Sequence, residues 1–484
     1  MIMKKYIYIP LVLMLIFLSG CNGGRELYTL PAPEIILEDP DGIYTLKLGN
    51  TLTLAPQVRY GQDAVYAWLM DGKTVGTQSV YVFNADQTGT YYLTFNVIRQ
   101  DITVGRNIRI DVERNALPAI FLAVPENGFS ILPDSTLTLH PIVENGQNAT
   151  FTWKVNDVEV SRDSIYLFSA PQSGLYNLFF SAMNTEGRDE IRFSITVSAQ
   201  TGDENAQDPP EIPSGKYFRP VQDNSRADWA VIHEYLPAPG QFINECVTGG
   251  FSGEKTIQEA ILYAGNRLQN NVFVSLGAFG GYIVVGFDHS IVNDGGYNLQ
   301  IEGNAHDNSS EPGIVWVMQD SNGNGLPDDG WFELKGSEDN SARVKRHYSV
   351  TYFKPRHPGS SVHWIDNKGI TGKVDYLGAY HDQETYYPLW INTEYYTLTG
   401  TCLESRNYLS ETGSWISPSY AWGYADNDRQ GLFRISDAIT PEGEPINLEF
   451  IDFVKIQTGV NGKSGWLGEI STEITGIRDY NLVK

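Results

Sequence analysis

The sequence predicts an all-β fold in which two tandem β-sandwiches of one kind are followed by a larger C-terminal β-sandwich. Short apolar segments with strand-like alternation recur along the chain and are separated by Gly, Asn and Asp turns. A set of residues in the N-terminal half repeats at constant spacing. After these repeats, one segment, 255–266, is typical of a short helix.

The N-terminus has the pattern of an export signal. Two lysines precede an apolar run over 7–18, which is too short for an ordinary transmembrane helix, and Leu18-Ser19-Gly20-Cys21 follows. Residues 1–21 resemble the signal peptide and lipobox of bacterial lipoproteins, which implies that Cys21 is lipidated and becomes the mature N-terminus. A plain secretory signal is the alternative. Acyl chains on Cys21 would anchor the protein to a membrane.

An internal duplication covers the next part of the chain. Four features recur 85 residues later without a gap. They are the Thr-Leu-Thr-Leu runs that begin at 51 and 136, the tryptophans Trp68 and Trp153, the glycines Gly89 and Gly174, and the tyrosines Tyr91 and Tyr176. We expect each tryptophan to fill a sandwich core and each tyrosine to form a corner whose hydroxyl bonds back to the chain.

The two copies, over 31–113 and 118–198, resemble the PKD-like or immunoglobulin-like domains of bacterial surface proteins. Ala67-Trp68-Leu69-Met70-Asp71-Gly72 and Thr152-Trp153-Lys154-Val155-Asn156 carry this resemblance. It implies that the copies act as spacers. The segment 199–215 is rich in Asp, Glu, Pro, Gly and Gln, which predicts a flexible linker.

Strands dominate the prediction for 216–484, which we interpret as an antiparallel sandwich of jelly-roll type. The expected strands cover 273–276, 282–287, 298–301, 313–318, 347–353 and 446–458. The segments 281–288, 298–304 and 311–317, with the closing 451–458 and 465–469, resemble a discoidin-like sandwich of bacterial cell-surface proteins. This resemblance implies a ligand-binding module, with glycans as the usual ligand.

An acidic loop in this module has the spacing of a calcium site. Oxygen-bearing side chains occupy positions 1, 3, 5 and 9 of an EF-hand-like register that starts at Asp320, with Gly325 at position 6. Position 12 is Trp331 instead of a glutamate, so another carboxylate would have to complete the shell. The predicted ligands of a structural calcium ion are Asp320, Asn322, Asn324, Leu326, Asp328 and Asp329. The alternative is a polar loop whose residues only make turns.

Aromatic residues concentrate between 376 and 424, outside the clear strand patterns. Such rings either pack over one another or form a platform for a sugar or a large planar ligand such as a corrinoid. The predicted ligand-binding residues are Tyr386, Tyr387, Trp390, Trp415, Tyr420 and Trp422.

Charge and cysteine content limit the function further. The net charge of −24 opposes binding to phosphate backbones, so we do not expect a nucleic-acid partner. Cys246 and Cys402 could form a disulfide in an oxidising compartment.

Motifs of known enzymes are lacking in the sequence. It contains neither a zinc-ligand spacing nor a G-x-S-x-G nucleophile motif. Carboxylates such as Glu311, Glu333, Asp375 and Asp382 could pair as in a glycoside hydrolase, and this stays an alternative. We therefore predict a binding protein and assign no catalytic residue.

The whole arrangement resembles cell-surface lipoproteins of Bacteroidetes type that carry PKD-like domains. The resemblance implies an outer-membrane lipoprotein that binds an extracellular ligand, with the cell surface expected and the periplasmic face as the alternative. It also implies a corrinoid of the vitamin B12 (cobalamin) kind as ligand, taken up through a TonB-dependent transporter. A glycan-binding surface protein, a glycoside hydrolase and a structural adhesin are the alternatives.

Overall fold

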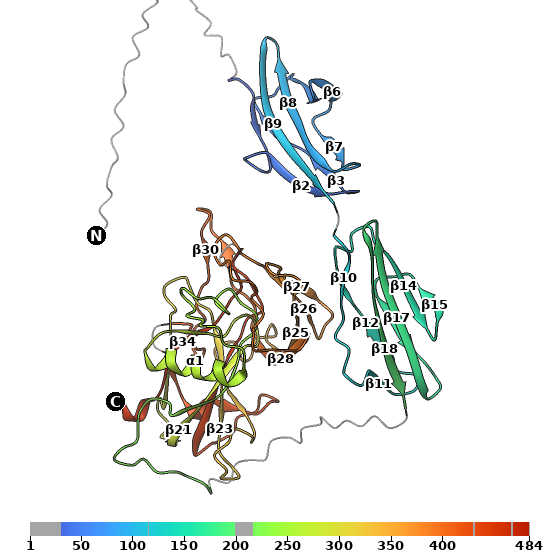
Figure 1. Cartoon of the computed structure of the whole chain (residues 1–484). Helices are drawn as coiled ribbons and strands as arrows, with labels where there is room; N and C mark the ends of the chain where they lie inside the picture. Colours follow the sequence, from blue (N-terminus) through green and yellow to red (C-terminus); the bar gives the residue numbers. More distant parts are fainter. Residues whose placement is uncertain (1–30, 115, 199–215, 429–430, 466–467, 484) are drawn as a thin grey trace, which may run out of the picture. The chain divides into compact units, whose positions relative to one another are not determined.

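The computed structural model describes residues 31–114, 116–198, 216–428, 431–465 and 468–483. The predicted signal peptide with Cys21 and the predicted linker over 199–215 lie outside the described residues. The chain divides into two compact units, Met1–Ala116 and Leu117–Lys484. As predicted, nearly all regular structure is β (Figure 1).

The first unit is a β-sandwich of short strands. Its five-stranded sheet has the order β2-β9-β8-β5-β6, formed by Ile43–Lys47, Ile102–Glu113, Gly89–Arg99, Val65–Met70 and Lys73–Gly76. Two strand pairs complete it, β1-β4 from Glu34–Ile36 and Gln57–Arg59, and β3-β7 from Thr51–Leu54 and Tyr81–Asn84. Alternate residues of β8, such as Leu93, Phe95 and Val97, are buried, as the period of two requires.

The second copy, at the start of the second unit, repeats this sandwich. Its five-stranded sheet has the order β11-β18-β17-β14-β15, formed by Phe129–Ile131, Gly187–Val197, Gly174–Asn184, Thr150–Val155 and Val158–Ser161. The strand pairs are β10-β13 from Ala119–Phe121 and Ile142–Glu144, and β12-β16 from Thr136–Leu139 and Tyr166–Ser169. Both sheets end in one parallel edge pair, β2-β9 and β11-β18.

Equivalent hydrogen bonds in the two copies confirm the predicted roles of the tryptophans and tyrosines. Trp68 and Trp153 are fully buried, and their indole nitrogens donate to the backbone oxygens of residues 78 and 163 at 2.9 and 3.0 Å. The hydroxyls of Tyr91 and Tyr176 donate to the backbone oxygens four residues earlier. Each pair of acceptors is again 85 residues apart, so the duplication extends to contacts between side chain and backbone.

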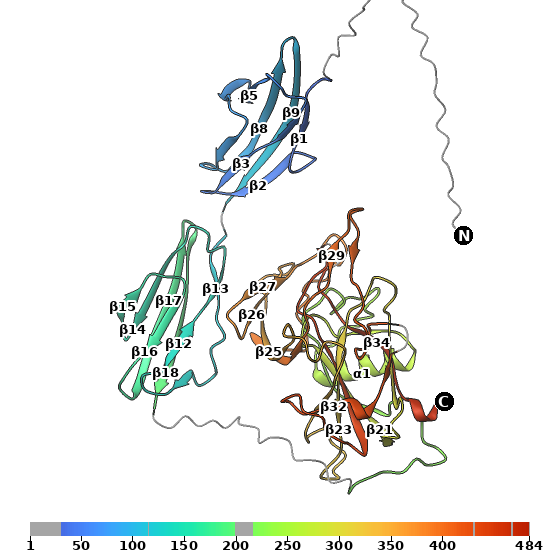
Figure 2. The ribbon, with the colours of Figure 1, turned by 180° about the vertical axis from the view of Figure 1, so that it is seen from behind.

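The C-terminal module of the second unit contains two packed antiparallel sheets (Figures 1 and 2). The larger has the order β19-β21-β33-β23-β24-β32, formed by Val231–Leu236, Tyr282–Val292, Phe450–Thr458, Gly313–Met318, Phe332–Leu334 and Ala438–Ile439. The smaller has the order β20-β34-β22-β31, formed by Val274–Ser275, Glu473–Asp479, Leu299–Gly303 and Leu432–Phe433. This pair of sheets is the predicted sandwich, whereas its discoidin-like relationship stays a prediction.

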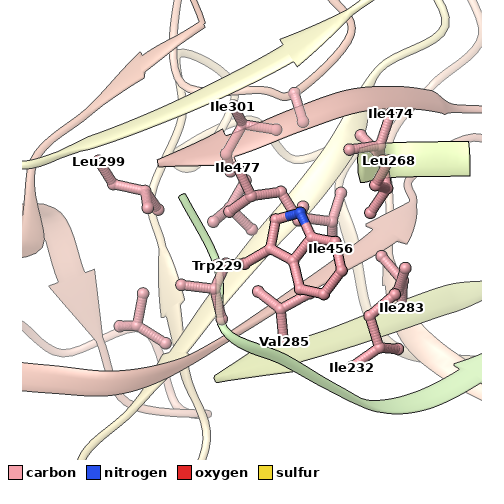
Figure 3. Close-up of a cluster of buried hydrophobic side chains, with 14 of the residues drawn as sticks. Trp229, Ile232, Leu268, Ile283, Val285, Leu299, Ile301, Ile456, Ile474 and Ile477 are labelled. Atoms are coloured by element: carbon pink, nitrogen blue, oxygen red, sulfur yellow. The ribbon is translucent and has the colours of Figure 1, made fainter. Parts of the chain in front are cut away.

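Apolar side chains from both sheets fill the core between them (Figure 3). Val285 and Ile456 of the larger sheet contact the cluster that contains Ile301 and Ile477 of the smaller one, and Trp229 lies among them. A helix, α1 at Ile257–Gln269, closes one side of this core with Ala260, Ala264 and Leu268. The predicted helix, 255–266, overlaps α1. The N-terminus of α1 is fixed by a capping box between Thr256 and Glu259.

A third antiparallel sheet was not expected from the sequence. It has the order β27-β26-β25-β28, formed by Thr371–Val374, Val362–Asp366, Lys345–Phe353 and Tyr395–Cys402. Its own core contains Tyr348, Tyr352, Tyr386 and Tyr387. The other elements among the described residues are the hairpin β29-β30 at Tyr408–Leu409 and Trp415–Ile416 and the 3-10 helices η1 at Ile435–Asp437 and η3 at Tyr480–Leu482.

Cys246 and Cys402 do not form the predicted disulfide. Both thiols are free, because Cys246 is exposed on a loop whereas Cys402 is buried at the end of β28. The Cys402 thiol donates to the backbone oxygen of Leu403, and burial raises its pKa to about 11. A buried thiol of this kind is unreactive.

Candidate functional site

The loop that starts at Asp320 joins β23 to β24 and is organised by the Asp320 carboxylate. This carboxylate accepts hydrogen bonds from the backbone nitrogens of Gly323 at 2.6 Å and Gly325 at 2.9 Å. Both glycines have positive φ, 76° and 74°, a conformation that glycine adopts without a steric penalty. The sharp turn predicted at position 6 is therefore present at Gly325.

The other predicted calcium ligands lie in the same loop and contact one another. The side-chain amides of Asn322 and Asn324 donate to the two oxygens of Asp328 at 3.0 and 2.8 Å. Asp329 accepts from the backbone nitrogen of Ser321 at 2.9 Å. Hydrogen bonds from Asn324 and Asn322 lower the pKa of Asp328, whereas burial raises that of Asp329.

This loop gathers hard oxygen donors of the type that Ca²⁺ takes, without an ion-paired lysine or arginine among the described contacts of its three carboxylates. The donor set therefore fits a calcium ion. It also fits a loop closed only by its own hydrogen bonds, so calcium at this position stays a prediction.

Four of the six predicted ligand-binding aromatics are buried. Tyr386, Tyr387, Trp390 and Tyr420 are each less than 5% exposed. The segment that carries the first three folds over the third sheet, and the hydroxyls of the two tyrosines donate to the backbone oxygens of His381 and Thr393. These rings fill cores, so they do not form the exposed platform that the sequence suggested. Trp415 is half-buried in β30.

Trp422 is the exposed member of this set, with 46% of its surface accessible. It lines a hollow of about 330 Å³ between the end of β24, strand β31, helix η1 and the loop before Tyr424. We call this feature the Trp422 hollow. Its lining residues are Tyr297, Leu334, Lys335, Trp422, Gly423, Leu432, Phe433, Arg434 and Asp437.

Close backbone packing fixes the position of Trp422. The backbone nitrogen of Ser337 donates to the Trp422 oxygen at 3.0 Å. Gly423 has a φ of 88°, and a Cβ there would lie 2.5 Å from the Cα of Gly336. Gly336 in turn packs against the Tyr424 ring, which a Cβ would approach to 2.4 Å. The two glycines therefore allow the loop that carries Trp422 and Gly423, the Trp422 loop, to lie directly on the segment after β24.

The polar groups of the hollow carry opposite charges. The Arg434 guanidinium lies 4.4 Å from the centroid of the Tyr297 ring, which is 41% exposed. The Lys335 amine lies 3.8 Å from a carboxylate oxygen of Asp437. The hollow thus combines two accessible aromatic rings with hydrogen-bond donors and an acceptor, as in sites that orient small polar ligands.

Four of these residues, Tyr297, Lys335, Arg434 and Asp437, were missed from the sequence. Lys335 directly follows the buried strand β24, and Arg434 directly follows β31. The sequence signal that could have identified Lys335 and Arg434 is a charged residue directly after a short apolar run. β24 and β31 belong to different sheets, and the packing of the two sheets, which brings these strand ends together, is set by long-range contacts.

The carboxylates considered for a glycoside hydrolase lie in separate environments. Glu333 is buried beside Thr401 and is 3.4 Å from Arg346. Asp375 forms ion pairs with Lys463 and Lys373 at 2.6 and 3.2 Å. Glu311 lies in a different cluster, with Asp426 and Glu473. No described contact brings two of the four considered carboxylates together as an acid and base pair.

Comparison with protein families gives a match in the duplicated part of the chain. Residues 32–99 and 118–184 match the family described as "PKD-like domain". Both copies are PKD-like domains. These matches cover the strands from β1 to the end of β8, and from β10 to the end of β17. The C-terminal module is not part of this match.

Solved structures match about a third of this chain. A chimeric titin Z1Z2 is 13% identical over 36% of this chain and all of its own, with a TM-score of 0.29. Fibronectin(III)-like modules of Clostridium thermocellum CbhA are 11% identical over 34% of this chain and 94% of theirs, with a TM-score of 0.20. No curated protein matches this chain.

Among the described residues, no helix is both long and apolar enough to cross a membrane.

Proposed function

We propose that the chain is a lipid-anchored surface protein whose C-terminal module binds a small extracellular ligand in the Trp422 hollow. The observation that carries this proposal is the exposed Trp422 ring, which lines the same hollow as Tyr297, Arg434 and the Lys335 and Asp437 pair. The accessible part of this ring, 46% of its surface, is apolar area in contact with water, which is unfavourable. A ligand that covers the ring would remove this cost.

A saccharide fits this chemistry best. The face of an indole stacks on the C–H face of a sugar ring, while sugar hydroxyls bond to polar groups at the rim. Lys335 and Arg434 are donors and Asp437 is an acceptor. The rim therefore offers donors for the oxygen of a sugar hydroxyl and an acceptor for its hydrogen. Glycan binding is therefore the ligand assignment that we propose.

A corrinoid remains the second ligand because the resemblance to surface lipoproteins implies it. The volume of about 330 Å³ is at the lower end of the roughly 300–1,000 Å³ of ligand pockets. A corrin ring with its nucleotide loop is much larger than a sugar ring, so it would cover the rim of the hollow instead of entering it. Delivery to a TonB-dependent transporter would follow only from corrinoid binding.

The remaining parts support this function in the proposal. Lipid on Cys21 would hold the chain at the outer membrane, and the two PKD-like domains would act as spacers between anchor and module. Calcium bound by the Asp320 loop would stabilise the connection between β23 and β24, and β24 leads into Lys335 at the hollow.

The test uses the chain from Asn22 onward, with both PKD-like domains retained. It is applied to a glycan array and is mixed with cyanocobalamin, together with Trp422→Ala and the control Tyr408→Ala, which removes a ring 52% exposed on β29. We expect glycan signal from the parent and from the Tyr408 variant, and loss of signal from the Trp422 variant. Cyanocobalamin binding without glycan binding would show that the ligand is a corrinoid and not a glycan. Equal binding by the parent, Trp422→Ala and Tyr408→Ala would show that the ligand does not bind in the Trp422 hollow.

A further inference from the structure

Three carboxylates meet inside the C-terminal module at a place that the Trp422 hollow does not include. Glu311 precedes β23 of the larger sheet, Glu473 begins β34 of the smaller sheet, and Asp426 lies in the loop between Tyr424 and β31. One oxygen of each side chain lies within 4.8 Å of the other two. Asp426 and Glu473 are each 1% exposed, and Glu311 is half-buried.

The surrounding backbone holds these side chains in place. Asp426 accepts from the backbone nitrogens of Asn304, Ala305 and Glu473 at 2.8 to 2.9 Å. The absence of a side chain at Gly303 makes room for it, because a Cβ there would lie 2.3 Å from the Asp426 carboxylate. Glu311 accepts from the backbone nitrogen of Ser471 at 3.2 Å. The main-chain donors that hold the cluster thus all lie in or beside β22 and β34 of the smaller sheet.

One carboxylate oxygen of the cluster lacks a hydrogen-bond partner. Glu473 uses Oε2 to accept from the Asn304 amide at 3.1 Å, whereas its buried Oε1 has no partner. Nearby, Oε2 of Glu469 is also buried without a partner, and the Glu469 charge acts on Glu311. Among the described residues, no lysine, arginine or histidine forms an ion pair with Glu311, Asp426 or Glu473.

Buried anions without a counterion are strongly unfavourable. Either protons or a bound cation must therefore compensate the charge. Calcium to oxygen distances are about 2.3–2.6 Å, so oxygens on one ion lie up to about 5 Å apart, as they do here.

We propose that Glu311, Asp426 and Glu473 bind a buried divalent cation, with Ca²⁺ as the best match, at a site separate from the Asp320 loop. Mg²⁺ fits less well because it keeps several waters and near-ideal octahedral geometry, which a buried cluster with fixed side chains does not offer. The ion would join the start of β34 to the segment before β23. It would also fix Asp426, four residues after Trp422, and so hold the base of the Trp422 loop.

The test counts bound calcium and does not depend on the ligand of the hollow. The metal-free chain from Asn22 onward is dialysed against Ca²⁺, and bound ion is measured by elemental analysis for the parent, Glu473→Gln, Glu311→Gln and the control Asp320→Asn. We expect each glutamine variant to bind one Ca²⁺ fewer than the parent and to lose part of the rise in melting temperature that calcium produces. The Asp320 variant should keep the ion of the carboxylate cluster.

The glutamine variants also control for folding. Glutamine keeps the shape of glutamate and removes one buried charge, so their metal-free melting temperatures should equal or exceed that of the parent. Glutamine variants that retain the calcium count of the parent would overturn the proposal. A parent protein that binds no Ca²⁺ at all would overturn it as well, and would indicate that Glu311 and Glu473 share a proton instead.

Discussion

Each PKD-like sandwich has one fully buried tryptophan in its core. Trp68 contacts Phe95 and Tyr81 in the first PKD-like domain, and its ring nitrogen is satisfied by the backbone of Gln78. Trp153 has the same environment from Phe180 and Tyr166. A fully buried ring of this size cannot be truncated without leaving a cavity.

Replacement of Trp68 by alanine should lower the free energy of unfolding of the first unit by about 3–5 kcal/mol, as is usual for a large buried aromatic. The matched control is Tyr92→Ala, which removes a ring 62% exposed on β8 and should cost less than about 1 kcal/mol. Urea unfolding followed by circular dichroism measures both. Equal costs for the two variants would show that Trp68 is not the centre of this core.

Glu333 gives a pH dependence with a defined sign. Burial, opposed by Thr401 and Arg346, raises its pKa from 4.5 to about 7 in the folded protein, and Asp339 beside Arg346 adds to the rise. Between pH 4.5 and about 7 the unfolded chain releases this proton while the folded chain keeps it. The contribution that Glu333 makes to folding stability is therefore fully present below pH 4.5 and is lost as the pH rises through about 7.

Glu333→Gln should remove this part of the pH dependence. One pKa unit corresponds to about 1.4 kcal/mol, so the unfolding free energy of the parent should fall by up to about 3 kcal/mol more than that of the variant between pH 4 and 8. Chemical unfolding at several pH values provides the comparison. Parallel curves for the two proteins would mean that Glu333 is ionised in the folded state.

At the scale of elements, local sequence patterns predicted those parts of the fold that interactions between nearby residues determine. The offset of 85 residues predicted the duplication because equal cores need equal side chains at Trp68 and Trp153. The helix was predicted over 255–266, and α1 begins and ends within three residues of those bounds because Thr256 and Glu259 form its cap. Strand β23 was predicted at Gly313–Met318 because its apolar run is closed by turn residues on both sides.

Features that depend on contacts distant in sequence were not predictable in this way. Tyr386 and Tyr387 stand outside clear strands, so the sequence did not show that their segment covers a third sheet. The Trp422 hollow needs β24, β31 and η1 to meet, and the carboxylate cluster needs Glu311 to meet Glu473. Neither juxtaposition leaves a local pattern.

The Gly423 turn gives a prediction at this scale. Gly423→Ala places a Cβ against the backbone of Gly336 and must displace the Trp422 loop, so it should weaken ligand binding and destabilise the module. Gly413→Ala is the matched control, because Gly413 has a similar φ of 81° but open space around a Cβ. The control should cost only about 1–2 kcal/mol and keep ligand binding. Urea unfolding and a binding titration measure the two effects, and equal behaviour of the variants would contradict the packing argument.

At the scale of the whole molecule, the chain combines an expected anchor, two PKD-like domains and one larger module with a hollow and carboxylate clusters. The excess of acidic over basic residues, 58 against 34, opposes adhesion of the chain to an anionic surface. In the proposal, lipid and not charge holds the protein at the membrane.

Cys21→Ala should release the full-length protein from the membrane fraction when it is expressed in a Gram-negative host, because the alanine cannot be acylated. Fractionation and immunoblotting of parent and variant measure this, with Cys246→Ala as the control that keeps Cys21. A Cys21 variant that stays in the membrane fraction in the same amount as the parent would contradict the lipid anchor.

The most direct test of ligand binding in the hollow is a calorimetric titration with the saccharide that gives the strongest array signal, performed on the parent and on Trp422→Ala. We predict at least about a tenfold loss of affinity in the variant, equivalent to about 1.4 kcal/mol, with an unchanged melting temperature. An unchanged affinity in a folded Trp422→Ala protein would show that the ligand binds elsewhere and would contradict the proposed site.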